Sequence, residues 1–218
     1  MLPILGLLLA AGTPSSPPLP LSNGIVITKT TVVAAREYSF PTPQGSKKAG
    51  DEQIPTLKPA FAKDGTITAA TSSSISDGAA ALVLTRQSVA DADKLTPVAR
   101  VVAMAAHAQA PKDFTTAPVG AIQKLLARAG WSIDDVDLFE VNEAFACVAM
   151  FAMHDLGIPH DKINVNGGAT ALGHPIGASG ARIVTTLIAA LKARGLKKGV
   201  ASLCIGGGEA TAVALELI

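Results

Sequence analysis

The stretch 136–156, VDLFEVNEAFACVAMFAMHDL, decides the fold, because it places one short strand directly before one helix. Its first six residues, VDLFEV, are short, apolar and partly β-branched, which is typical of a buried strand. The remainder, from Glu143 on, has the length of a helix and stops at Gly157, a residue type that commonly ends helices. The apolar run VAMFA at 148–152 leaves no wide polar face, so we expect this helix to be buried between layers.

The same alternation of strand and helix continues on both sides of this unit. Upstream, the sequence predicts strands at 25–34, 79–85 and 97–106, the second of them buried, and an amphipathic helix at 118–129. Downstream, it predicts a short strand at 163–165, a long and mostly apolar helix at 177–194, and a hairpin of strands at 200–205 and 210–217. Strands and helices in this order predict an α/β fold in which helices cover a mixed sheet.

The composition of the 218 residues provides ample apolar material for a core. Apolar residues make up 49% and charged residues 16%, so part of the surface is expected to be covered by another chain, and we predict a homo-oligomer. The net charge of +1 and the aromatic content of 4% argue against binding of nucleic acid or of an anionic membrane. Two cysteines, Cys147 and Cys204, are too few for a disulfide framework and indicate a reducing, cytoplasmic setting.

The first fifty residues are expected to be irregular or disordered, apart from the strand at 25–34. Prolines interrupt the stretch 12–50 repeatedly. Residues 1–11, MLPILGLLLAA, have the apolar run of a secretory signal, but no basic residue precedes it, and the run is too short to span a bilayer. We therefore favour a disordered or misassigned terminus over a signal peptide.

Asn142 marks the first of three short segments that can carry chemistry. It lies in VNEAFA (141–146), where a strand passes into a helix. Ligands bind at such places in α/β folds, because the free N–H groups of the helix point outward there. The side chain of Asn142 can either cap the helix or hold a water molecule or a substrate oxygen.

His174 and Cys204 mark the other two segments. His174 stands between glycine and proline in NGGATALGHPIGASG (166–180), ahead of the long helix, which favours acid–base or oxyanion work over an ordinary turn. Cys204 ends a strand in SLCIGGG (202–208). A free cysteine is usually a small core residue, but the N–H groups of a triple-glycine turn can point into a site and stabilise an anion.

Together and in this order, the three segments resemble signature sequences of the thiolase family. The resemblance runs from about residue 51 to the end of the chain and includes LKPAFAKDGTITAATSSSISDGAAALVL (57–84). It implies a thiolase-like layered fold, half of a five-layer αβαβα arrangement. It also implies that 51–94 is the end of the thiolase amino-terminal domain and 95–218 the carboxy-terminal domain, with 1–50 as a separate amino-terminal segment.

The resemblance implies an acyl-CoA C-acyltransferase of the acetyl-CoA acetyltransferase type, acting in fatty acid metabolism by Claisen condensation or by thiolysis of 3-ketoacyl-CoA. Cys204 matches the cysteine that shuttles the α-proton. His174 matches the histidine that activates the nucleophile, and Asn142 matches the asparagine whose bound water forms one oxyanion hole with that histidine. The backbone N–H of Gly206 matches a donor of the other oxyanion hole.

The remaining matches concern the substrate. Ser73 resembles a serine that contacts the pantetheine of coenzyme A, and Ala144 and Phe145 stand where the family borders the same tunnel. Coenzyme A thioesters are then the substrates, and the resemblance implies no cofactor and no metal.

The nucleophile of the family has no counterpart in this sequence. In thiolases it is a cysteine in the amino-terminal half, whereas no cysteine precedes Cys147, which lies inside the predicted helix and is interpreted as a core residue. We therefore expect the chain to be inactive alone, with the other half missing or supplied by a separate chain. The alternative is a non-catalytic, truncated thiolase fragment that acts only in association. A ketoacyl synthase shares the layered fold, but such enzymes lack the cysteine of CIGGG.

Overall fold

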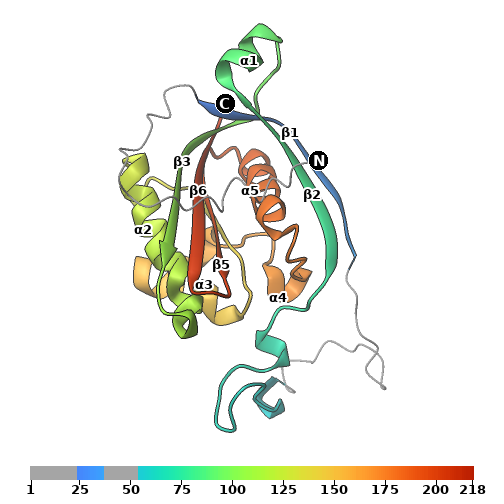
Figure 1. Cartoon of the computed structure of the whole chain (residues 1–218), viewed down its shortest axis with the longest axis vertical. Coiled ribbons are helices and arrows are strands. Elements are labelled where there is room, and N and C mark those ends of the chain that lie inside the picture. Colours follow the sequence, from blue (N-terminus) through green and yellow to red (C-terminus); the bar gives the residue numbers. More distant parts are fainter. Residues whose placement is uncertain (1–23, 37–53) are drawn as a thin grey trace.

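The computed structural model describes residues 24–36 and 54–218, which build a six-stranded sheet with helices on both faces (Figure 1). In sheet order the strands are β2 (Asp77–Arg86), β1 (Ile25–Arg36), β3 (Ala99–Ala108), β6 (Glu209–Leu217), β5 (Lys198–Ile205) and β4 (Leu138–Val141). Neighbouring strands are antiparallel except β4 and β5, which are parallel. The predicted mixed sheet is confirmed.

Two helices, α2 and α3, cover one face of the central strands. α2 (Ala117–Ala129) has Pro118 in its first turn, where the missing N–H costs no hydrogen bond, and ends at Gly130 with φ 66°. α3 (Ala146–Leu156) ends at Gly157 in the same left-handed conformation. Their buried side chains share a core cluster with the strands, including Ile122, Leu125, Phe139 and Val148. The burial expected for α3 is incomplete, because Met150 and Phe151 are exposed.

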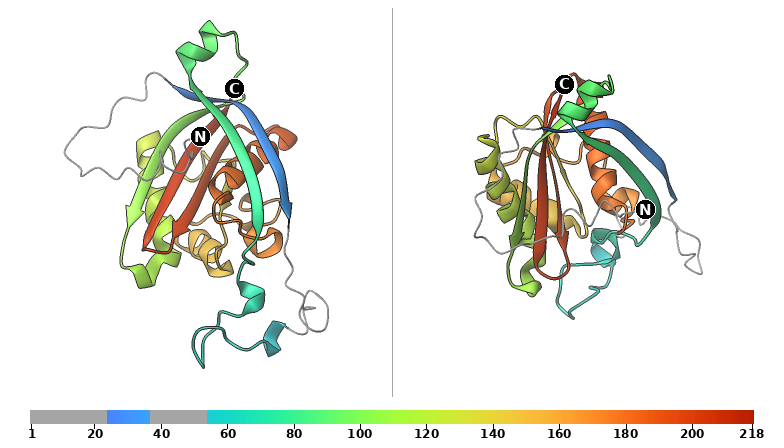
Figure 2. Two further views of the ribbon diagram at one scale, coloured as in Figure 1. Left: turned by 45° about the vertical axis from the view of Figure 1, so that its right-hand side comes forward. Right: turned by 45° about the horizontal axis from the view of Figure 1, so that its top comes forward.

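α5 (Ser179–Arg194) lies on the other face and is enclosed by the curved sheet. It contacts β4 and β5 as well as β1 and β2. Figures 1 and 2 show β1 and β2 arching over it. Nine of its sixteen residues are buried, as expected for a helix between two layers. Its apolar side chains form a second core cluster with Leu138, Ala201 and Leu215.

Several short elements connect these parts and are not evident in the sequence. They are the α-helices α1 (Gln87–Ala92) and α4 (Ala169–Leu172) and the 3₁₀ helices η2 (Ile54–Thr56), η3 (Ala69–Thr71), η4 (Pro111–Thr116) and η5 (His160–Lys162). The strand predicted at 25–34 is β1, while the expectations for 1–23 and 37–53 lie outside the described residues. In the described part of the chain, no helix is long and apolar enough to cross a membrane.

Two predicted strands differ from the structure. The one at 163–165 is reduced to a single bridge between Ile163 and Phe139, because the backbone turns at Asn164, with φ 48°. The strand predicted as buried at 79–85 is β2, and Leu82 is the one buried residue among its ten. β2 is exposed because it forms the edge of the sheet.

Replacing Gly199 with alanine is expected to destabilise the fold by about 1–3 kcal/mol. A Cβ at this position of β5 would lie 2.8–2.9 Å from three side-chain carbons of Leu187, which is completely buried on α5. Gly177→Ala is the matched control, since no atom of the described residues lies within 4 Å of the Cβ it adds. The free energy of unfolding of both variants can be measured in urea. Equal losses of stability would contradict the described packing of α5 on β5.

Candidate active site

Asn142 follows β4 directly and is almost completely buried, with 1% of its surface exposed. Its backbone N–H donates to the carbonyl of Ser202 at 2.9 Å, which extends the pairing of β4 with β5 by one residue. α3 has Phe145 at its N-cap position, so the helix predicted from Glu143 starts later and Asn142 does not cap it. The side chain of Asn142 instead contacts other polar side chains of the site.

His174 is held by backbone contacts with the segment that precedes β2. Its N–H donates to the carbonyl of Ser74 at 2.9 Å. Gly173, directly before it, has φ 90°, and a Cβ there would lie 2.2 Å from the hydroxyl of Ser76. The glycine is therefore required both for the turn and for the close approach of the two segments.

Both ring nitrogens of His174 have a partner. Nε2 lies 3.3 Å from Nδ2 of Asn142, and Nδ1 lies 2.6 Å from Oγ of Ser179, the first residue of α5. The hydroxyl of Ser179 donates to the carbonyl of Pro175 at 2.9 Å. Burial lowers the pKa of His174, and the guanidinium of Arg182 lowers it further. The imidazole is therefore neutral at physiological pH.

A buried ion pair adjoins these side chains. Arg182 of α5 donates from Nη2 to Oδ1 of Asn142 at 3.3 Å, and its Nη1 lies 3.6 Å from Oε2 of Glu140 on β4. Burial raises the pKa of Glu140 to about 7, although the charge of Arg182 opposes the shift. Neither Glu140 nor Arg182 was predicted as a site residue from the sequence. A charged residue inside an otherwise buried strand or helix was the available signal, because such a charge needs a partner.

Cys204 lies near the end of β5, two residues beyond Ser202. It is buried in the core cluster of α2 and α3. Burial raises the pKa of its thiol to about 11; a backbone hydrogen bond opposes this shift, and the thiol of Cys147 adds to it. Within residues 24–36 and 54–218 no hydrogen bond joins Cys204 to His174 or Asn142, so the convergence of all three groups stays a prediction. Cys147, interpreted as core, is partly exposed.

The glycine turn after Cys204 is open at one end and tightly packed at the other. Gly206 is exposed, and a Cβ built on it would meet no atom of residues 24–36 and 54–218 within 4 Å. Gly208 has φ 99° and lies so close to Gln109 that a Cβ would be 2.4 Å from the carbonyl oxygen of that residue. The space beside Gly206 is compatible with a bound group, and its role as an oxyanion donor stays a prediction.

Ser73, Ala144 and Phe145, the three predicted substrate contacts, lie together. The N–H and the hydroxyl of Ser73 both donate to the carbonyl of Ala144, at 3.2 and 3.0 Å. The ring of Phe145 makes edge contacts with Phe61 and Phe114, at centroid distances of 5.7 and 6.2 Å. These contacts tie the segment before β2 to the start of α3, whereas a contact with coenzyme A stays a prediction.

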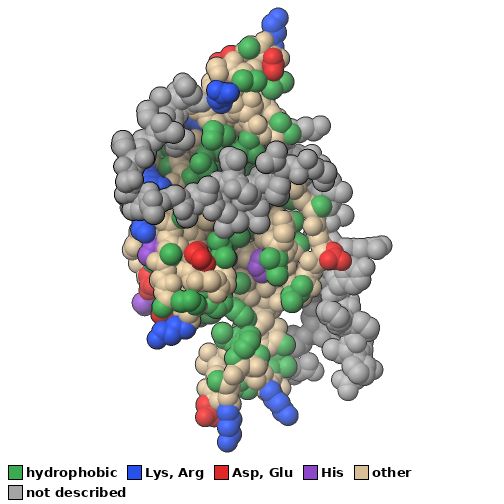
Figure 3. Space-filling model, viewed as in Figure 1, with side chains coloured by type: hydrophobic (Ala, Val, Ile, Leu, Met, Phe, Trp, Pro, Cys, Tyr) green, Lys and Arg blue, Asp and Glu red, His purple; other side chains and the backbone are tan. Residues whose placement is uncertain are grey.

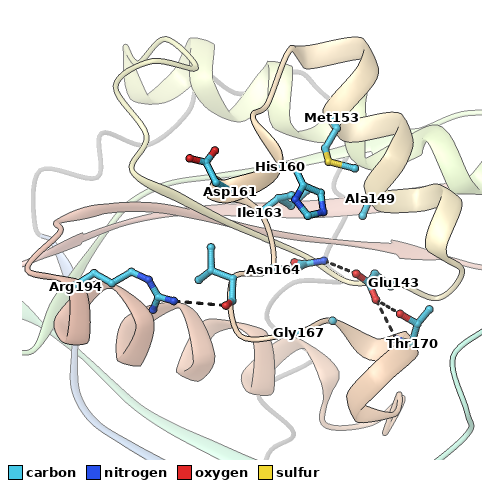
Figure 4. Close-up of a pocket in the computed structure, with 12 residues that line it drawn as sticks. Glu143, Ala149, Met153, His160, Asp161, Ile163, Asn164, Gly167, Thr170 and Arg194 are labelled. Atoms are coloured by element: carbon cyan, nitrogen blue, oxygen red, sulfur yellow. Dashed lines mark hydrogen bonds between the residues drawn. The ribbon is translucent and has the colours of Figure 1, made fainter. Parts of the chain in front are cut away.

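A pocket of about 440 Å³ opens beside this region, between α3, the loop that includes η5, and the end of α5 (Figure 4). No sequence pattern predicts this pocket. Glu143 lines it, and its carboxylate accepts hydrogen bonds from Nδ2 of Asn164 at 2.9 Å and from the N–H and hydroxyl of Thr170. A Cβ on Gly168 would lie 2.1–2.3 Å from that carboxylate. Glu143 therefore anchors the glycine-rich stretch to the start of α3.

Comparison with known families and proteins gives consistent matches. The model of the thiolase carboxy-terminal domain matches residues 95–217, and that of the thiolase amino-terminal domain matches residues 42–88. The chain is 51% identical to a probable acetyl-CoA acetyltransferase of Dictyostelium discoideum over 78% of this chain and 41% of the relative. It is 49% identical to an acetyl-CoA acetyltransferase of Chromobacterium violaceum over 77% of this chain and 43% of the relative.

Solved structures agree with this fold. The crystal structure of the Bacillus anthracis acetyl-CoA acetyltransferase matches with a TM-score of 0.74 and 46% identity, over 77% of this chain and 42% of that one. Human mitochondrial 3-ketoacyl-CoA thiolase in complex with CoA matches with a TM-score of 0.76 and 41% identity, over 83% of this chain and 45% of that one. The predicted thiolase-like fold is confirmed, and the chain spans somewhat less than half the length of these relatives.

The stability of the fold is expected to decrease as pH rises from about 5 to 8. Because the folded pKa of Glu140, about 7, lies above its ordinary value of 4.5, its contribution is complete below pH 4.5 and is lost as pH rises through 7. The loss is on the order of 3 kcal/mol. Glutamine cannot titrate, so Glu140→Gln should flatten the dependence of the unfolding free energy on pH, measured in urea. Glu216→Gln, which replaces a partly exposed side chain on β6, should leave this dependence unchanged. Parallel profiles for the unsubstituted chain and Glu140→Gln would contradict this assignment.

Proposed function

Because this chain belongs to the thiolase family, we propose that it provides the half of an acyl-CoA C-acyltransferase site that handles protons and stabilises charge. The observation that carries the proposal is the contact between Asn142 and His174, which are 32 residues apart in the sequence and meet at the end of β4. Relatives bear the names acetyl-CoA acetyltransferase and 3-ketoacyl-CoA thiolase. The proposed reaction is therefore acyl transfer between coenzyme A thioesters, by Claisen condensation or thiolysis.

The chemistry of the proposed reaction fits these side chains. Charge develops on a thioester oxygen, and a fixed donor aimed at such an oxygen contributes about 3–4 kcal/mol. We propose that Asn142, through a water molecule, and the N–H of Gly206 are such donors. His174 is neutral and can accept the proton of a thiol. Cys204 is protonated at neutral pH because its pKa is raised, which suits it to protonate the carbanion released in thiolysis.

The proposal requires a nucleophile from outside these 218 residues. No cysteine precedes Cys147 in the sequence, and burial raises the pKa of both cysteines that are present. A thiol with a raised pKa supplies little thiolate, which is the reactive form. We therefore propose that no acyl-enzyme forms on this chain alone. A cytoplasmic location is part of the proposal, because both cysteines are free thiols, as expected in a reducing compartment.

The purified chain is expected to show no thiolysis of acetoacetyl-CoA, followed as loss of the enolate absorbance in the presence of CoA. Adding the amino-terminal part of the Chromobacterium violaceum relative, cut where its match to this chain begins, should restore turnover, because that part is expected to carry the nucleophilic cysteine. In the mixture, Cys204→Ser should reduce the rate by about 100-fold or more. Cys147→Ser is the matched control and should leave the rate unchanged.

Turnover by the chain alone would contradict the proposal. A mixture that associates and shows no turnover would favour the second candidate, a non-catalytic fragment that acts only in association. The absence of any cysteine before Cys147 is the observation that favours this alternative. Sequencing the DNA upstream of the Met1 codon, for an in-frame segment that encodes a strand, a cysteine and a helix, would separate a truncated gene from an enzyme of two chains.

Exposed apolar side chains on segments that border the site support association with another chain, which we propose includes a second copy. Phe61 and Ile75 are each 74% exposed and Ile176 is 64% exposed, although Ile75 pairs with His174 in a backbone bridge. Figure 3 shows hydrophobic side chains at several places on the face it presents. Apolar surface of this kind favours association in water.

At micromolar concentration the chain is expected to be a dimer or larger in multi-angle light scattering. The double variant Ile75→Lys, Ile176→Lys should shift it toward a monomer, because charged side chains in these exposed places disfavour burial. Leu95→Lys is the control, since Leu95 is 43% exposed just after α1 and away from the site. A uniform monomer of the unsubstituted chain would rule out the proposed association.

A further inference from the structure

Arg182 is a buried cation whose hydrogen-bonding capacity is only partly used. Its side chain is 9% exposed, and it contacts the carboxylate of Glu140 and the amide of Asn142. Among the described residues, its Nε and Nη1 atoms have no hydrogen-bond partner, nor does Oε1 of Glu140. Burying an ion pair with imperfect geometry is commonly less favourable than burying apolar residues of the same size. We therefore expect this pair to have a role that two apolar residues could not have.

The guanidinium determines how the amide of Asn142 is turned. Arginine has only donors, so the atom of Asn142 that lies 3.3 Å from Nη2 must be the carbonyl oxygen Oδ1. The NH₂ group of the same amide therefore faces its other neighbour, Nε2 of His174, at 3.3 Å. Without Arg182, either end of the amide could form a hydrogen bond with an imidazole nitrogen.

The orientation of this amide fixes the tautomer of His174 in turn. An NH₂ group only donates, so Nε2 accepts through its lone pair, and the proton of the neutral ring is on Nδ1. Nδ1 donates to Oγ of Ser179 at 2.6 Å, and the hydroxyl of Ser179 donates to the carbonyl of Pro175 at 2.9 Å. From Arg182 to Pro175, each donor thus meets one acceptor, and all hydrogen bonds point the same way along the chain of groups.

We propose that Arg182 is a positioning residue that, through Asn142, holds His174 as the neutral Nδ1–H tautomer and leaves Nε2 as the atom that accepts a proton. This inference rests on the proposed function and deepens it, because it names the atom of His174 that receives the proton of the nucleophilic thiol. Glu140 lies 3.6 Å from the guanidinium and supplies a counter-charge beside it. The same cation lowers the pKa of His174, which maintains the neutral ring.

The tautomer can be measured on the full chain by two-bond ¹H–¹⁵N correlation spectra of labelled histidine, at about pH 8, with the signal of His174 assigned from its loss in His174→Gln. In the unsubstituted chain, Nδ1 should appear as a protonated nitrogen and Nε2 as an unprotonated one, the reverse of the tautomer that predominates in free histidine. Arg182→Met should reduce the Nδ1–H population several-fold, toward the minor share found in free histidine.

Two controls separate this role from a purely structural one. Glu140→Gln removes the counter-charge but keeps the donor to Asn142, and Arg194→Met removes an exposed cation from the far end of α5. Both should retain the Nδ1–H tautomer. A structural role alone would lower the stability of Arg182→Met and leave its tautomer unchanged, which would overturn the proposal.

A further variant keeps the proposal testable if Arg182→Met does not fold. The double variant Glu140→Met, Arg182→Met removes both charges and leaves no unpaired carboxylate, and it should show the same change of tautomer. A proton on Nε2 in the unsubstituted chain overturns the proposal whatever the variants do. The measurement involves no turnover and no second polypeptide, so its outcome does not depend on whether the acyl-transfer proposal holds.

Discussion

The buried pair of Glu140 and Arg182 is the interaction on which the site depends. Glu140 stands two residues before Asn142, and Arg182 stands three residues after Ser179, so each charge is covalently close to a group that contacts His174. The rest of the contact between α5 and the sheet is mainly apolar, and apolar packing tolerates small displacements better than an ion pair in a medium of low dielectric does. The pair therefore joins α5 and β4 close to the imidazole.

Close backbone approaches fix the other segments of the site. A Cβ on Gly173 would reach the hydroxyl of Ser76, and one on Gly168 would reach the carboxylate of Glu143. These two glycines allow the stretch between β4 and α5 to contact both the segment before β2 and the start of α3. The glycine-rich stretch is thus a set of packing contacts around His174, in addition to being a turn.

Local sequence patterns predict the elements that have clear terminal residues and a clear apolar periodicity. They fail where contacts with distant parts of the chain determine the structure. Pro118 and Gly130 delimit α2, and glycines end α3 and α5 as expected. The exposure of β2 could not be predicted, because it depends on which strand lies at the edge of the sheet. In the site, Asn142 and His174 stand out by their motifs. Glu140 and Arg182 act through partners about 40 residues away, and Ser179 acts through a partner in an adjacent turn. No local pattern reveals these partners.

The helices on the two faces of the sheet differ in how far their outer sides are covered. β1 pairs with β2 along most of its length and with β3 at one end, and it precedes both segments that match the thiolase models, so this covering of α5 uses residues outside the family pattern. No corresponding layer among the described residues covers Met150 and Phe151 of α3. Cys204 packs on the α3 face, whereas Arg182 belongs to the α5 face. Under the proposed function, a substrate that engages both Cys204 and His174 lies across the carboxyl ends of β4 and β5.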